Sequence, residues 1–250
     1  MLLGLVGSEM CIRDSRQALK EKVKPVLFIN KVDRLINELQ VTPEDMMNRF
    51  QETITKVNKL IKQFAPEEFK KEWQVSVMDG TVAFGSAYHN WGITIPYMKK
   101  SGVTMTDIFQ YCNDEKQKEL AQAAPVHEVL LDMAVTKLPS PVEAQPYRIP
   151  NIWTGDLESS IGKSMMSCDP EAELAMMITK IWMDPHAGEV AVGRIYSGAI
   201  SQGESVFAIG AAKPERVQQV SMMVGGDRIT VPKVVAGNLS LIHIPSPRDQ

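Results

Sequence analysis

The sequence has little cysteine. Cys11, Cys112 and Cys168 stand far apart among 250 residues, without a CxxC spacing. An odd number of widely spaced cysteines is typical of reduced thiols, so we expect a cytoplasmic protein. Histidine is also scarce, and its four residues form no cluster with the spacing of metal ligands: His89, His127, His186 and His243. The sequence therefore predicts no metal site built from its own side chains.

Long apolar runs and a strong charge of either sign are missing as well. No stretch approaches the roughly eighteen apolar residues that a membrane-spanning helix requires. The net charge of −3 provides no general basic field for nucleic acid, so any such contact would be a local patch. With 44% hydrophobic and 23% charged residues, the composition indicates a soluble globular chain of one large domain or two ordinary ones.

What the sequence does contain is an apolar stretch followed directly by a polar tetrad. Residues 26–29, Val-Leu-Phe-Ile, are typical of a strand buried on both faces of a parallel α/β sheet. Asn30-Lys31-Val32-Asp33 follows at the carboxyl end of that strand. Open α/β sheets bind their ligands at this end, which makes the tetrad a candidate binding site.

The tetrad has the donors and acceptors needed to read guanine. An ionised Asp33 can accept two parallel hydrogen bonds, from the ring N–H and the exocyclic amino group, whereas adenine would leave the charge unpaired. The methylene stem of Lys31 can lie along a flat ring, and the Asn30 amide can donate to the base or tie neighbouring loops together. The alternative is an ordinary solvated turn, but the strand in front favours the guanine site.

The strongest helix signal begins after Thr42. Thr42 can cap the helix, Pro43 suits its first turn, and Asp45 stands where a capping partner would. An apolar stripe at steps of three and four then predicts packing against the sheet: Met47, Phe50, Ile54, Val57, Ile61 and Phe64. Further helical segments are expected over 16–24, 104–111, 115–123 and 126–138.

A second candidate loop lies one strand further along. Two short strands, 75–77 and 81–84, are predicted around an Asp79-Gly80 turn. The second runs into Gly85-Ser86-Ala87, small residues that let backbone N–H groups approach a ligand closely. A plain turn explains this tripeptide better when it is taken alone, so its position beside the tetrad is what makes it a candidate.

The composition changes after residue 138. Four prolines predict a semi-rigid connector that interrupts helices and marks a domain boundary: Pro139, Pro141, Pro146 and Pro150. Short strand patterns then alternate with glycine-rich turns, which predicts a small β-barrel or sandwich. The expected strands cover residues 174–183, 189–197, 204–209, 216–224 and 228–235.

The tetrad, the Gly-Ser-Ala loop and the barrel pattern together resemble the elongation factor 2 family of translocation GTPases, most closely its archaeal members. The resemblance runs from Arg16 to Asn238, through VKPVLFINKVDRLINEL, FGSAYHNWGI, LPSPVEAQPYRIPNIW, DPHAGEVAVGRIYSG and VPKVVAGN. It implies an α/β fold: the C-terminal part of a P-loop-type GTPase domain over 16–138, a linker over 139–150, and an incomplete translation-factor β-barrel over 151–239. It also implies a set of guanine-binding residues, with the Ala87 N–H facing the base oxygen: Asn30, Lys31, Asp33, Ser86 and Ala87.

The resemblance further implies that GTP hydrolysis is coupled to movement of tRNA and mRNA on the ribosome. The implied cofactors are GTP or GDP and Mg²⁺, and the implied partners are rRNA and ribosomal proteins, with no membrane and a monomeric state. The family's GxxxxGK[ST] loop, first switch and Asp-Xaa-Pro-Gly-His segment do not occur in the 250 residues. We therefore interpret the chain as an internal fragment, place the Mg²⁺ ligands upstream, and expect no catalytic residue here and no hydrolysis by the chain alone.

Several alternatives stay open. The chain could be a non-catalytic ribosome-binding module, a bacterial-type translocase or a release-factor GTPase. FGSAYHNWGI and DPHAGEVAVGR resemble the archaeal family more closely than they resemble either of these two GTPases. A kinase or dehydrogenase is disfavoured because no phosphate loop and no Rossmann glycine fingerprint occurs. Residues 1–15 and 240–250 do not continue the family pattern. We interpret VGSEMCIRDS and SLIHIPSPRDQ as translated sequencing-adapter read-through and expect both ends to lack packed structure.

Overall fold

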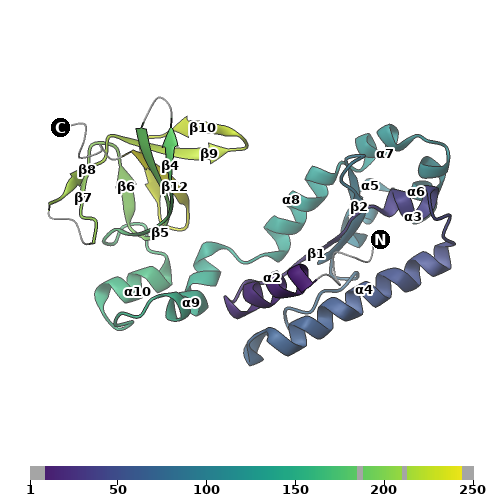
Figure 1. Cartoon of the computed structure of the whole chain (residues 1–250), viewed down its shortest axis with the longest axis horizontal. Coiled ribbons are helices and arrows are strands. Elements are labelled where there is room, and N and C mark those ends of the chain that lie inside the picture. Colours follow the sequence, from purple (N-terminus) through teal and green to yellow (C-terminus); the bar gives the residue numbers. More distant parts are fainter. Residues whose placement is uncertain (1–8, 185–187, 210–212, 244–250) are drawn as a thin grey trace. The chain divides into compact units, whose positions relative to one another are not determined.

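The computed structural model describes residues 9–184, 188–209 and 213–243 (Figure 1). The chain divides into two compact units, Met1–Pro139 and Ser140–Gln250, each described by itself below. Within the described ranges, no helix has the length and apolar character needed to cross a membrane.

The first unit is built on a three-stranded sheet in the order β1-β2-β3: β1 Leu27–Ile29, β2 Val82–Ser86 and β3 Trp91–Ile93. β1 runs parallel to β2, and β3 is antiparallel to β2. β2 is fully buried, whereas β1 is only half-buried, so the expected burial of residues 26–29 on both faces is wrong. The reason is position, because β1 is an edge strand that pairs only with β2 within the described ranges.

Helices make up most of the rest of this unit: α2 Glu9–Lys20, α3 Val32–Asn37, α4 Pro43–Phe64, η1 Glu67–Phe69, α5 Ile95–Ser101, α6 Met105–Asn113, α7 Gln117–Ala123 and α8 Val126–Lys137. The helices expected over 104–111, 115–123 and 126–138 are confirmed, while α3 and α5 were not predicted. Residues 9–15 were expected to lack structure, but they form the first turns of α2. Residues 13–15 are exposed, and the buried Leu19 anchors the other end of the helix.

α4 begins as the sequence predicts. The Asp45 N–H donates to Thr42 Oγ1 at 3.2 Å, and Pro43 lies in the first turn. The helix covers the sheet, with the Phe50 ring centroid 4.6 Å from that of Phe84 on β2. Its buried side chains are Met46, Phe50, Ile54 and Ile61. Met47, which the stripe placed in the core, is exposed, because Met46 occupies the inward position in the first turns.

Residues 75–77 do not form the strand that their sequence predicts. The side chain of Asn58 on α4 takes both backbone groups of Val75, with its Oδ1 accepting at 2.8 Å and its Nδ2 donating at 2.9 Å. The backbone groups of Val75 are therefore satisfied by a carboxamide instead of by a neighbouring strand.

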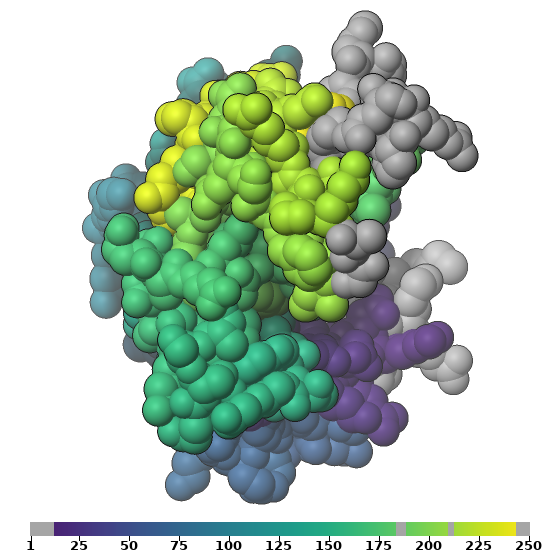
Figure 2. Space-filling view, turned by 90° about the vertical axis from the view of Figure 1, so that its left-hand side faces the viewer, coloured from purple at the N-terminus to yellow at the C-terminus, as the bar shows by residue number. Residues whose placement is uncertain are grey.

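The second unit opens with two helices, α9 Pro141–Ile152 and α10 Ser160–Ser167. The prediction that prolines interrupt helices over 139–150 is wrong. Ser140 and Glu143 form a capping box, Pro141 lies in the first turn, and Pro146 and Pro150 lie inside the helix. Gln145 of α9 donates through Nε2 to the carbonyls of Met165 and Tyr196, so it ties α9 to α10 and to the strands. Figure 2 shows the teal-green surface of the helices continuous with the green and yellow surface of the strands.

The strands of this unit form one five-stranded antiparallel sheet and two small pairs. The large sheet has the order β10-β9-β12-β5-β4: β4 Ala175–Asp184, β5 Gly188–Ser197, β9 Gln219–Val224, β10 Asp227–Thr230 and β12 Leu239–His243. The small pairs are β6 Ala199–Ser201 with β11 Lys233–Val235, and β7 Ser205–Val206 with β8 Glu215–Arg216. Within the described ranges the strands do not close into one barrel, in agreement with the incomplete barrel expected. The strand predicted over 204–209 is observed only at Ser205–Val206, as β7.

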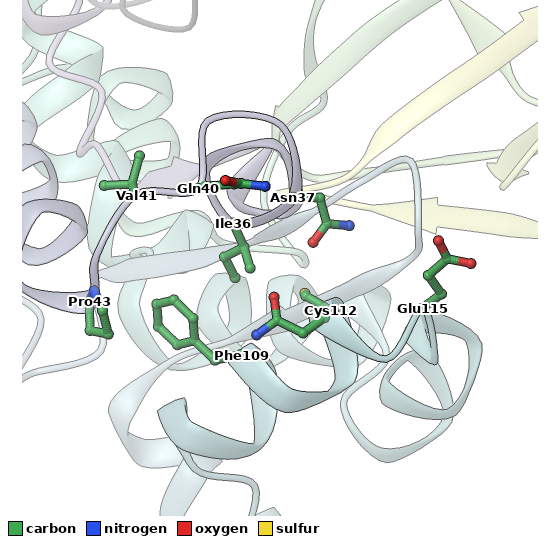
Figure 3. Close-up of a pocket in the computed structure, with 9 residues that line it drawn as sticks. Ile36, Asn37, Gln40, Val41, Pro43, Phe109, Cys112 and Glu115 are labelled. Atoms are coloured by element: carbon green, nitrogen blue, oxygen red, sulfur yellow. The ribbon is translucent and has the colours of Figure 1, made fainter.

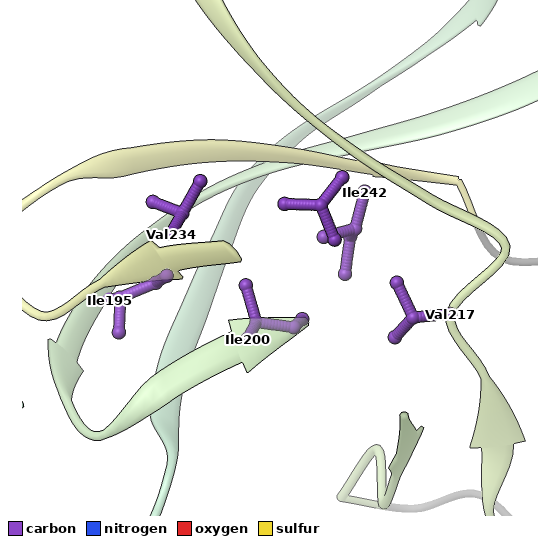
Figure 4. Close-up of a cluster of buried hydrophobic side chains, with 6 residues drawn as sticks. Ile195, Ile200, Val217, Val234 and Ile242 are labelled. Carbon is purple, nitrogen blue, oxygen red and sulfur yellow. The ribbon is translucent and has the colours of Figure 1, made fainter. Parts of the chain in front are cut away.

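The core of the second unit includes residues from β12 (Figure 4). Its buried members are Ile195, Ile200, Val217, Val220, Val234 and Ile242. β12 pairs with both β5 and β9, and Leu241 and Ile242 are 1% and 3% exposed. The expectation that residues 240–250 lack packed structure is therefore wrong for 240–243, while 244–250 lie outside the described residues. Ser240, Leu241 and Ile242 are consecutive and all buried, and the strand is paired on both sides, so its backbone groups are satisfied within the sheet.

Candidate guanine-binding site

The tetrad and the Gly-Ser-Ala loop meet at one edge of the first sheet. Because β1 and β2 run parallel, Asn30 after β1 lies beside Ala87 after β2. The Ala87 N–H donates to Asn30 Oδ1 at 2.9 Å, and the Lys31 N–H donates to the same oxygen at 2.7 Å. The carboxamide of Asn30 thus ties the two loops together, one of the two roles the sequence left open.

This bond changes the expectation for Ala87. The resemblance implied that its N–H faces a base oxygen, but in this structure the N–H donates to Asn30. A base oxygen would have to take that N–H from the carboxamide. Ser86 is 1% exposed, and its Oγ accepts from the His89 N–H at 3.3 Å, so its hydroxyl holds the turn that follows β2.

Lys31 marks the point where β1 ends and α3 begins. Its φ of 65° is in the left-handed region, which is uncommon for a residue with a side chain and is enriched at functional sites. The residue is exposed, so its stem is available to a flat ring at the surface.

Asp33, in the first turn of α3, is the most informative residue of the site. Its side chain is only 11% exposed, and Oδ1 has no hydrogen-bond partner in the described parts of the chain. Its other oxygen, Oδ2, lies 3.7 Å from Nε2 of His89. A buried carboxylate oxygen without a donor costs free energy. A ligand that brings two N–H donors would remove that cost.

His89 is the site residue that the sequence did not predict. It lies two residues beyond Ala87, in the turn that joins β2 to β3. The only signal in the sequence was its closeness to the Gly-Ser-Ala loop, because no periodic pattern links it to Asp33.

A pocket of about 640 Å³ lies beside this site, between α3 and α6 (Figure 3). Its lining residues are Ile36, Asn37, Gln40, Val41, Pro43, Phe109, Cys112, Asn113 and Glu115. None of the five predicted guanine-binding residues is among them. Asn37 lies one helical turn beyond Asp33 on α3, so the pocket adjoins the tetrad without containing it.

The buried thiol of Cys112 gives a pH-dependent prediction for the first unit. Burial raises the pKa of the Cys112 thiol to about 12, and the negative charge of Asp33 contributes a smaller part of this increase. An unfolded thiol ionises near its ordinary pKa of about 8.5, so the unfolded state loses a proton that the folded state keeps. We expect the free energy of unfolding to fall above that pH, by up to about 1.4 kcal/mol per pH unit. Urea unfolding at several pH values would measure it, and an equal slope in Cys112→Ala would contradict the assignment.

Both units of the chain match known protein families. The elongation factor Tu GTP binding domain matches residues 9–140, which is more than half of the chain. The chain belongs to this family. The match begins at residue 9 and so includes residues 9–15, which were expected to lie outside the family pattern.

The second unit matches elongation factor G domain 2 over residues 173–245, so this family's match also continues past Asn238. The chain is similar to "Elongation factor 2" of Methanococcus maripaludis strain C6, 59% identical over 224 residues, or 90% of this chain and 31% of the relative. The protein of that name from Methanopyrus kandleri is 59% identical over 227 residues, or 91% of this chain and 18% of the relative. The resemblance to archaeal elongation factor 2 is thereby confirmed. The chain spans about a third or less of the length of these relatives.

The described residues fit a guanine base better than they fit a metal ion. The unpartnered Oδ1 of Asp33 and the adjoining Lys31 stem suit the N–H edge and the face of the base. Within the described ranges, no three His, Cys, Asp or Glu side chains are grouped so that they could hold a metal ion.

Proposed function

We propose that the chain carries the guanine-reading half of the GTP-binding domain and part of the second domain of an elongation factor 2 type translocation GTPase. The observation that carries this is the buried Asp33 carboxylate, whose Oδ1 lacks a partner among the described residues, at the carboxyl end of β1. The names of the relatives support the translational role. The GTPase part then lies in the unit that ends at Pro139, and the barrel part lies in the unit that begins at Ser140 and opens with α9.

Each site residue has a defined task in this proposal. Asp33 accepts the ring N–H and the amino group of guanine, and the Lys31 stem covers one face of the base. Asn30 holds the Ala87 loop beside the tetrad. GTP is the substrate of the whole protein, and the ribosome with its tRNA and mRNA is the partner on which hydrolysis drives movement.

The test of this assignment is base selection. Asp33→Asn should exchange a preference for guanine nucleotides for a preference for xanthine nucleotides. Retention of full guanine preference in that variant would overturn the proposal.

We expect the 250-residue chain alone to show no GTP hydrolysis. A nucleoside triphosphate carries most of its charge on the phosphates, which are normally met by a glycine-rich cradle, a lysine and Mg²⁺. No GxxxxGK[ST] loop occurs in the sequence. The base contact alone corresponds to millimolar affinity at best, since about 4 kcal/mol gives that dissociation constant. The unaltered chain and its Asp33→Ala variant should therefore release phosphate from GTP at the same background rate. GTP hydrolysis that persists in Asp33→Ala would not depend on the proposed guanine site.

A further inference from the structure

The imidazole of His89 is held against Asp33 by the turn that joins β2 to β3. The His89 N–H donates to Ser86 Oγ, and the Asn90 N–H donates to the Ala87 carbonyl at 3.4 Å. Asn90 has a φ of 59°, and its carbonyl accepts from the Val126 N–H of α8 at 3.0 Å. The turn is therefore fixed at both ends, and it places the ring beside the carboxylate.

The contact involves the Asp33 carboxylate, which is the group proposed to accept hydrogen bonds from guanine. His89 Nε2 lies 3.7 Å from Asp33 Oδ2, which is within ion-pair range but longer than a hydrogen bond. The His89 side chain is 34% exposed, whereas that of Asp33 is 11% exposed. The ring therefore lies on the solvent side of a carboxylate that is otherwise enclosed.

We propose that His89 is a further residue of the guanine site, which occupies the place of the base at Asp33 and has to leave before guanine binds. The inference rests on the proposed function, because it assumes that Asp33 reads guanine. A base needs both carboxylate oxygens, so it competes with the imidazole for Oδ2. The same competition applies at Ala87, whose N–H is held by Asn30. Without a nucleotide, Asp33 Oδ2 and the Ala87 N–H are therefore paired with other groups of the site.

The competition is expected to depend on pH. Imidazole side chains gain positive charge as the pH falls from about 8 to 6, which strengthens attraction to a carboxylate. Other titratable groups lie on this loop and on the elements that adjoin it, and they include Lys31, Arg34, Tyr88, Asp107, Tyr111, Cys112, His127, Glu128, Asp132 and Lys137. The Tyr88 ring meets the His89 ring edge-on at 4.9 Å, Glu128 accepts from the Tyr97 hydroxyl at 2.9 Å, and the raised pKa of Cys112 keeps its thiol neutral. Asp33 is the carboxylate paired with His89.

The experiment titrates the 250-residue chain with GDP and follows amide signals of residues 30–33 and 86–90 by NMR. His89→Ala should tighten GDP binding about fivefold at pH 6, equivalent to about 1 kcal/mol, and less at pH 8. His89→Gln, which cannot become charged, should remove the difference between the two pH values. His127→Ala, which removes an exposed imidazole from α8, is the matched control and should leave GDP affinity unchanged.

The outcomes separate the inference from the proposed function. Asp33→Asn could change the preference from GDP to xanthosine diphosphate while His89→Ala binds GDP no more tightly than the unaltered chain. In that case the role of His89 is wrong and the guanine site stands. If neither GDP nor xanthosine diphosphate at millimolar concentration moves the amide signals of residues 30–33 and 86–90 in any variant, the proposed function fails, and the role of His89 fails with it.

Discussion

Replacement of Asp33 by Asn is expected to change the base preference from guanine to xanthine. The introduced carboxamide would accept from the ring N–H and donate to the carbonyl that replaces the amino group of guanine. A bidentate base contact discriminates by about 1–3 kcal/mol. The loss for one base and the gain for the other add, so the preference ratio should shift by about 30-fold to about 2 × 10⁴-fold.

Measurement of this shift needs tight nucleotide binding. A chimera would place residues 16–238 within the remainder of the Methanococcus maripaludis relative, of which this chain covers 31%. GTP and xanthosine triphosphate affinities would then be compared in the chimera with and without Asp33→Asn. Asp79→Asn is a suitable control, because Asp79 holds the turn before β2 through Thr81. Equal base preference in the Asp33 variant and the parent would show that the tetrad does not read the base.

The parts of the site that the sequence could predict are those that depend on strand direction. The sequence placed the Gly-Ser-Ala loop one strand beyond the tetrad, and a parallel pair brings the ends of β1 and β2 to one edge of the sheet. The contact of His89 with Asp33 could not be predicted in this way. It depends on a turn fixed by a side-chain bond from Ser86 and by the positive φ of Asn90. Neither feature leaves a periodic pattern in the sequence.

The two errors in the second unit have different physical causes. The prolines of 139–150 were expected to interrupt helices, but the capping box of Ser140 and Glu143 starts α9 and Gln145 ties it to neighbouring elements. Those bonds hold a helix whose Pro146 and Pro150 each lack a backbone donor. β12 was missed because residues 240–250 were interpreted as read-through outside the family pattern, whereas residues 239–243 pair with β5 and β9.

Ile242→Ala is expected to destabilise the second unit by about 2–5 kcal/mol, the usual cost of truncating a large buried aliphatic side chain. Ile242 is 3% exposed and packs in the core with Ile195 and Val220 (Figure 4). β12 lies between β5 and β9, so its loss would also leave two inner sheet edges unpaired. Urea unfolding followed by NMR signals of the second unit would measure the change separately from the first unit.

Leu239→Ala provides the matched control for this prediction. It removes side-chain atoms from the same strand, but Leu239 is 51% exposed, so the stability should change by about 0.5 kcal/mol or less. A large loss at Ile242 with little change at Leu239 would show that residues 240–243 complete the sheet, in agreement with the family match that extends to residue 245. Equal and small effects at both positions would mean that β12 is not part of the folded core, as the sequence alone had led us to expect.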